Sequence, residues 1–183
     1  MDVTYDEAKF TEMLLYVAQR LESDRAGGAT KLNKVLFFAD FAHVRRTGAP
    51  ISGADYQKLR NGPAPRRLRP VRQLIVSTGQ AELRREEFLG YEVHRLIPRR
   101  DPDLSLLNPD ELATIDKVLE DLSGLNAMQV SALSHAEAGW RLVDEGETIP
   151  YQAALVGAAQ VSTPTTRRLE AEVAARYGLT NAS

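Results

Sequence analysis

The sequence predicts an α+β fold that is predominantly α-helical, a compact helical domain around a buried central helix at about residues 30–47 with a small antiparallel β-hairpin at about residues 80–97. Three observations lead to this prediction. Apolar residues recur at helical spacing in several segments, as in amphipathic helices. The stretch TKLNKVLFFADFAHVRRT is apolar on almost every face, which indicates a helix enclosed by others. The segment QAELRREEFLGYEVHRLIP alternates apolar and charged residues on both sides of a Gly, as a hairpin does.

Local signals delimit the first two helices. Thr4 and Glu7 have the spacing of a capping box, so we expect the first helix to begin near Tyr5. The run RAGGA ends that helix. Thr30 is the expected N-cap of the central helix, and Gly48 is expected to end it.

The segment between the central helix and the hairpin is rich in Gly and Pro. We expect an ordered loop with at most one helical turn at residues 54–59, because prolines prevent a longer helix. A short helix follows at about residues 66–76, where Pro70 indicates a kink or a later start. Its inward-facing residues are expected to be Leu68, Val71, Leu74 and Ile75.

Two capping boxes mark helices in the C-terminal half of the chain. Asn108 with Glu111 begins one helix, and Asn126 with Gln129 begins the next. The apolar residues of the second of these helices are Met128, Val130 and Leu133. A further short helix is expected at residues 148–156, with a Pro tolerated in its first turn.

All of these elements belong to one expected domain over residues 5–156. Residues 157–183 are expected to form a linker and a short amphipathic helix, because a small, polar stretch precedes apolar residues spaced by four. We expect that helix to pack on the domain or on a partner.

Length and composition limit the class of protein. The chain has 183 residues, close to one ordinary domain, and 43% of them are hydrophobic, which suffices for a core. The absence of Cys excludes disulfides and Cys-based zinc sites. The N-terminus lacks the pattern of a signal peptide, and no run approaches the roughly 20 apolar residues of a membrane span. We therefore expect a cytoplasmic protein with no membrane partner.

Charge is distributed unevenly along the chain. Residues 1–100 hold 18 Lys or Arg and 12 Asp or Glu, whereas residues 101–183 hold 5 and 13. No acidic residue occurs between Asp55 and Glu82. The candidate partner-binding residues in this interval are Lys58, Arg60, Arg66, Arg67, Arg69 and Arg72.

This basic interval has two interpretations of about equal weight. It meets an acidic partner surface, or the basic half of the chain lies against its own acidic half. Nucleic-acid binding by this chain alone is not favoured, because the interval has no interleaved aromatic residues and no basic recognition helix is evident.

Two pairs of residues are candidate chemical sites. Asp40 and His43 share a helix face, but no third metal ligand accompanies them, so we expect a hydrogen-bonded or interfacial pair. Ser134 and His135 are adjacent and do not face each other on a helix, which makes a poor nucleophile–base dyad. Trp140 is expected to be a core anchor or, less favoured, part of a partner surface. We expect no catalytic residue, metal or cofactor, and no enzyme activity.

Two blocks of the sequence stand out together, TKLNKVLFFADFAHVRRTGAPISGADYQKLRNGPAP and LSHAEAGWRLVDEGETIPYQAAL. In this order and at this separation they resemble the Panacea (SocA-like or GepA-like) antitoxin domain family. The motif residues, expected to be mainly structural, are Lys31, Leu32, Lys34, Phe38, Gly48, Pro50, Tyr56, Gly62, Pro63, Ser134, His135, Trp140, Gly146 and Tyr151. Asn61 stands where the family commonly has an aromatic residue, and Ala64 where it often has Val.

The resemblance implies a mostly helical domain that works by binding. The implied function is that of an antitoxin of a bacterial or phage toxin–antitoxin pair, which neutralises a cognate toxin encoded by a neighbouring gene through direct protein–protein contact. An alternative is a proteolytic adaptor that delivers the toxin to an AAA+ protease, or a phage-associated regulatory protein. An enzyme that acts through His43 or His135 is the third hypothesis.

Overall fold

The computed structural model describes residues 3–88 and 90–156, so the predicted C-terminal helix lies outside the described residues. In chain order the elements are α1 (Glu7–Arg20), α2 (Ala29–Thr47), β1 (Tyr56–Gln57), β2 (Ala64–Pro65), α3 (Leu68–Ser77), β3 (Ala81–Phe88), β4 (Tyr91–Pro98), η1 (Leu104–Leu106), α4 (Pro109–Asp121), α5 (Ala127–Ala136), α6 (Ala138–Leu142), β5 (Thr148–Ile149) and η2 (Tyr151–Leu155). The predicted α+β, mostly helical fold class is confirmed.

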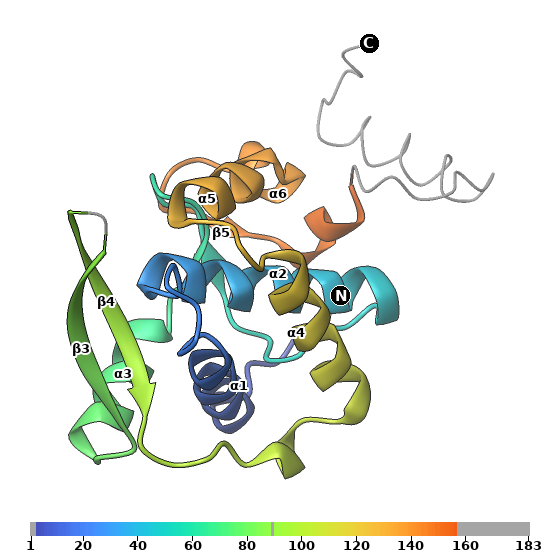
Figure 1. Cartoon of the computed structure of the whole chain (residues 1–183). Helices are drawn as coiled ribbons and strands as arrows, with labels where there is room; N and C mark the ends of the chain where they lie inside the picture. The colour runs from blue at the N-terminus through green and yellow to red at the C-terminus, as the bar shows by residue number, and fades with distance from the viewer. Residues whose placement is uncertain (1–2, 89, 157–183) are drawn as a thin grey trace.

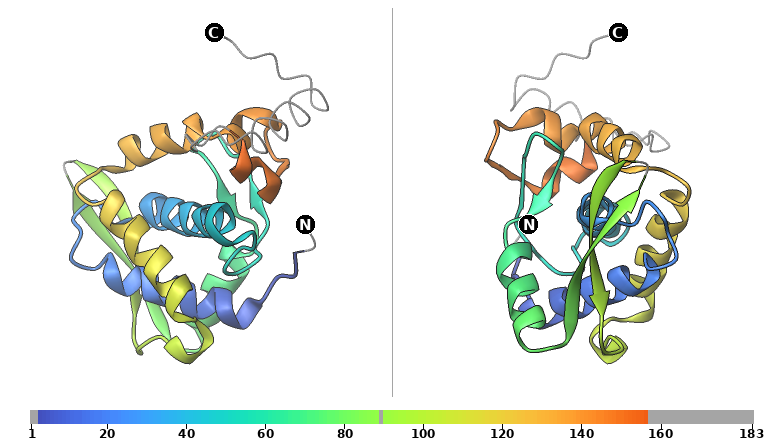
Figure 2. Two further views of the ribbon diagram at one scale, coloured as in Figure 1. Left: turned by 90° about the vertical axis from the view of Figure 1, so that its right-hand side faces the viewer. Right: turned by 60° about the vertical axis from the view of Figure 1, so that its left-hand side comes forward.

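The central helix is α2, as predicted. Figures 1 and 2 show it crossing the middle of the molecule, with α1 on one side of it, α5 and α6 on the other, and the β3–β4 hairpin beside one end. Val35, Leu36 and Phe37 are completely buried. Each such side chain contributes roughly 1.5–3 kcal/mol on burial, so α2 contributes a large part of the apolar core.

The predicted helix starts are wrong in two places. α2 begins after Gly28, two residues before the predicted N-cap Thr30, because Gly28 adopts the extended backbone that an N-cap needs. α1 is capped by Asp6, whose Oδ1 accepts from the Lys9 N–H at 2.9 Å, in place of the predicted box at Thr4. The Asp6 N–H donates to the carbonyl of Ser52, so a tertiary contact fixes where this helix starts.

Other helix signals are confirmed. Gly48 ends α2 in the left-handed conformation, with φ of 85°. The capping boxes at Asn108 and Asn126 are both complete, with reciprocal side-chain-to-backbone bonds. α3 begins at Leu68, which places Pro70 in its first turn, where a missing N–H leaves no helical bond unmade.

Three predicted details are corrected by tertiary structure. Leu74 is 53% exposed, while the other three predicted inward residues of α3 are buried. Residues 54–59 contain strand β1 and no helical turn, and the predicted helix at 148–156 begins as strand β5. β1 pairs antiparallel with both β2 and β5 in a sheet of order β2-β1-β5. The pairing of β1 with β5 joins residues about ninety positions apart in the sequence, so it depends on the tertiary structure.

The predicted hairpin is confirmed. β3 pairs antiparallel with β4 in a register that sets Ala81 opposite Pro98. Leu96 and Ile97 of β4 are buried, while the charged residues of β3 face outward or lie at the margin of the core. The hairpin therefore packs on the helical core through β4.

Asp40 is fully buried on α2 and binds the loop that follows this helix. Its Oδ1 accepts the N–H groups of Ile51 and Ser52, both at 2.8 Å. Its Oδ2 accepts the Ser52 hydroxyl at 2.6 Å and the Tyr56 hydroxyl at 2.7 Å. Burial raises the pKa of Asp40, and these four donors act against that rise.

His43 holds the same loop independently of Asp40. Its Nδ1 lies 2.8 Å from the carbonyl oxygen of Ala49 and 2.9 Å from the Thr47 hydroxyl. Asp40 and His43 therefore bind the same loop through different partners, and the expected hydrogen bond between the two side chains is not formed. Nowhere in the described ranges do three or more His, Asp or Glu side chains gather as a metal site. None of the described helices has the length and apolarity to cross a membrane.

The Asp40 network predicts a graded response to substitution. Asp40→Leu leaves two buried N–H groups without acceptors, so we expect a loss of about 3 kcal/mol or more in the free energy of unfolding. Asp40→Asn keeps one oxygen for both N–H groups, and Tyr56 retains a second acceptor in the Leu36 carbonyl at 2.9 Å. We expect the loss in the free energy of unfolding for Asp40→Asn to be about half of that for Asp40→Leu, or less. Urea unfolding measures both variants, and equal losses would contradict the assignment.

Candidate partner-binding surface

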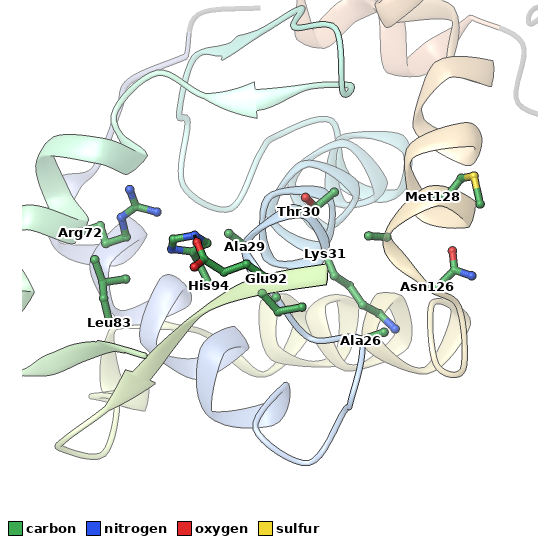
Figure 3. A pocket seen from close by; sticks show the side chains of 13 residues that line it. Ala26, Ala29, Thr30, Lys31, Arg72, Leu83, Glu92, His94, Asn126 and Met128 are labelled. Carbon is green, nitrogen blue, oxygen red and sulfur yellow. Dashed lines mark hydrogen bonds and ion pairs between the residues drawn. The ribbon is translucent and has the colours of Figure 1, made fainter. Parts of the chain in front are cut away.

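A groove of about 680 Å³ opens beside the N-terminal end of α2. Figure 3 shows Arg72, His94 and Glu92 on one side of it, Asn126 and Met128 on the other, and the first turn of α2 between them. Its walls therefore come from α3, the hairpin, α2 and α5, which are distant in sequence. No single segment could have indicated this surface in the sequence.

The lining of the groove is largely apolar. Met128 is 77% exposed and Leu83 is 48% exposed, so two large apolar side chains are in contact with solvent. Val93 forms the floor next to Gly28, where a Cβ atom would lie only 2.5 Å from Val93 Cγ1. The sequence placed Met128 on the apolar face of α5, but only Val130 of that predicted face is buried.

The charged groups around the groove differ in the partners that they have within the fold. Lys31 is buried, and its Nζ donates to Asp24 Oδ2 at 2.6 Å and to the Leu125 carbonyl at 2.8 Å. Glu92 lies 2.7 Å from His94 Nε2. The buried Nε of Arg72 has no acceptor within the described part of the chain. The first turn of α2 contains no acidic residue and no side-chain cap.

Four motif residues from the two sequence blocks meet around Lys34. This residue is 2% exposed, and its Nζ donates to the Pro63 carbonyl at 3.1 Å. Gly62 has a φ of 94°, and a Cβ atom there would lie 2.6 Å from Lys34 Cε and closer still to the Ser134 hydroxyl. Only Gly fits this left-handed, crowded position. Burial lowers the pKa of Lys34 from 10.5 to about 8.

Trp140 connects α6 to the loop between β1 and β2. Its ring stacks on His135 with a centroid separation of 4.1 Å, and its Nε1 donates to the Leu59 carbonyl at 3.3 Å. Lys58 Nζ lies 4.3 Å from the Trp140 ring centroid, a cation–π contact. Trp140 is partly buried against the core, as the core-anchor interpretation predicts.

Three further motif residues, Tyr56, Gly146 and Tyr151, also hold this scaffold together. Tyr56 and Tyr151 both pack against Phe41, and the Tyr151 hydroxyl donates to the Ala54 carbonyl at 2.7 Å. The Gly146 N–H donates to the Lys58 carbonyl at 2.8 Å. The motif thus joins α2 to the small sheet and to the segment after α6.

The six basic candidate residues have different environments. Lys58 binds Trp140 and the Val143 carbonyl, and Arg66 binds Gln57, Thr148 and the Gly146 carbonyl. The Arg67 guanidinium lies 5.9 Å from the Tyr5 ring centroid. Arg60 and Arg69 are exposed and form no hydrogen bond or ion pair with the described residues. Arg72 alone lines the groove.

The acidic half of the chain does meet the basic half. Lys9 pairs with Glu111 at 2.8 Å, and Arg20 pairs with Asp116 at 2.6 Å. Arg45 also pairs with Glu137. These three ion pairs therefore neutralise part of the charge asymmetry within the fold. None of them involves a basic residue of the interval 58–72.

A family model described as "Antitoxin SocA-like, Panacea domain" matches residues 32–141, which is more than half of the chain. The chain belongs to this family. The match contains Lys34, Gly62, Ser134 and Trp140, so the Panacea domain includes the Lys34 cluster from both sequence blocks. No curated protein and no solved structure matches this chain.

Buried Lys34 forms no ion pair with the described residues of this Panacea domain, and its burial predicts a pH-dependent stability. Between about pH 8 and pH 10.5 the unfolded chain keeps a proton that folded Lys34 has released, so the free energy of unfolding rises with pH. Lys34→Met removes this contribution. We expect the difference in unfolding free energy between wild type and variant to shift by about 3 kcal/mol in favour of wild type from about pH 7.5 to about pH 10.5. Urea unfolding at both values measures it, and a constant difference would contradict the assigned pKa.

Proposed function

We propose that this Panacea domain is an antitoxin that neutralises the toxin encoded by a neighbouring gene through direct protein contact. The observation that carries the proposal is the family match over residues 32–141, which suggests an antitoxin role and a protein partner. The structure supports a binding role because its motif residues build a rigid scaffold, beside which an apolar groove remains open. Such a protein acts by covering its partner's surface.

We further propose that the domain is not an enzyme. Ser134 is completely buried and its hydroxyl donates to the Ser131 carbonyl at 2.7 Å. His135 is stacked on Trp140, and His43 is engaged with the loop after α2. These contacts support a structural use of the three side chains.

Co-expression with the product of the adjacent gene tests the proposal. We expect the Panacea chain to restore growth and to co-purify with that product as a stable complex. The destabilised variant Asp40→Leu serves as a control and should restore growth less well at the same expression level.

Other outcomes of this experiment favour other functions. Growth rescue without a complex, lost when an AAA+ protease is deleted, would favour the proteolytic adaptor. A harmless neighbour that does not bind would contradict the antitoxin proposal. Turnover by the isolated domain that is abolished by His43→Ala or His135→Ala would favour an enzyme.

The basic interval gives a separate prediction for the complex. Arg60→Glu with Arg69→Glu reverses the two charges that form no bond with the described residues, so the fold is expected to be preserved. If this surface faces an acidic toxin, association at low salt slows about tenfold, and the effect disappears at high salt. Arg141→Glu, exposed and outside the interval, is the matched control. Identical association rates for wild type, the double variant and Arg141→Glu would contradict a contact between the basic interval and the toxin.

A further inference from the structure

We propose that the groove beside the N-terminal end of α2 is the surface that receives the toxin, and that it binds an apolar segment of the toxin that carries a carboxylate. This inference rests on the proposed antitoxin function. It adds the location of the contact and the chemistry of the segment that occupies it.

The apolar part of the inference comes from Met128, Leu83 and Val93. Met128 is 77% exposed and Leu83 is 48% exposed, although the fold buries apolar residues thoroughly around α2. They face a concave space whose size, about 680 Å³, is in the range of a binding pocket. Grooves of this kind bind a few apolar side chains of an extended or helical segment.

The carboxylate on the bound toxin segment is inferred from Arg72, which has no ion-pair partner among the described residues. Asp24 pairs with Lys31, and Glu92 lies 2.7 Å from His94 Nε2 and forms no ion pair with Arg72. Arg72 has a buried Nε without an acceptor and forms no ion pair with the described residues. A guanidinium that lines a groove without an ion-pair partner among the described residues can bind a carboxylate from outside with charge-assisted hydrogen bonds.

Substitutions at Met128 test whether the charge on the bound toxin segment is negative. It is the second residue of α5, after the N-cap Asn126, and it is 77% exposed. A Glu at this position is favourable for the helix, so Met128→Glu is expected to leave the fold intact. Met128→Lys removes the same apolar side chain and adds the opposite charge. Leu104→Glu is the control, because Leu104 is 42% exposed in η1, away from the groove.

We expect Met128→Glu to weaken binding of the toxin by about tenfold or more and Met128→Lys to weaken it clearly less. Arg72→Gln should weaken binding about tenfold. Leu104→Glu should bind within about twofold of wild type. Calorimetry on the purified proteins measures all four. Equal affinity of wild type and Met128→Glu for the toxin would contradict the assignment of the groove as the toxin-binding surface. Weaker binding by Met128→Lys than by Met128→Glu would contradict the inference that the bound segment carries a carboxylate.

Photo-crosslinking identifies the occupant directly. With p-benzoylphenylalanine in place of Met128, we expect the co-expressed complex to yield a crosslink to a toxin peptide that contains apolar residues and Asp or Glu. The same substitution at Leu104 should yield no crosslink to the toxin. A crosslink from position 128 to residues 157–183 of this chain, or to a second copy, would overturn the inference while leaving the antitoxin function intact. If wild type fails to bind the neighbouring product, the proposed function itself is contradicted and the inference fails with it.

Discussion

The fold depends on one buried carboxylate. Asp40 lies in the middle of a helix that is enclosed by apolar side chains, where an ionised group is stable only with several donors around it. Those donors come from Ile51, Ser52 and Tyr56, so the loop after α2 must return along the helix that it has just left. That path places β1, which then pairs with β2 and with β5 from the C-terminal half.

The other buried polar side chains of α2 extend the same principle. Lys31 joins Asp24 to the Leu125 carbonyl, and Lys34 reaches the Pro63 carbonyl under Gly62. A helix that looks apolar on every face therefore organises the chain through its few polar groups. These connections leave the side chains rigidly placed, which is what a protein that works by binding requires. They also help to define the groove, because its lining includes Gly28, which precedes α2, and Lys31 in the first turn of this helix.

The sequence predicted those features whose causes are local. The period of apolar residues predicted α2 and the hairpin, and side-chain spacing predicted the boxes at Asn108 and Asn126. The cap of α1 was misplaced because Asp6 is fixed by Ser52, far along the chain. The strands β1 and β5 were missed because each consists of two residues paired across about ninety positions. The groove was missed because its walls meet only in three dimensions, although the resemblance to the Panacea domain did name the residues that meet around Lys34.

Hydrogen exchange at the Ile51 and Ser52 amides tests the central role of Asp40 most directly. Both N–H groups lie in a loop and outside any regular element, so an ordinary loop would exchange them through local fluctuations. If the buried carboxylate holds this segment as described, both amides exchange only when the whole domain unfolds, with an opening free energy equal to that of global unfolding. Exchange through openings that cost several kcal/mol less than global unfolding would contradict the account.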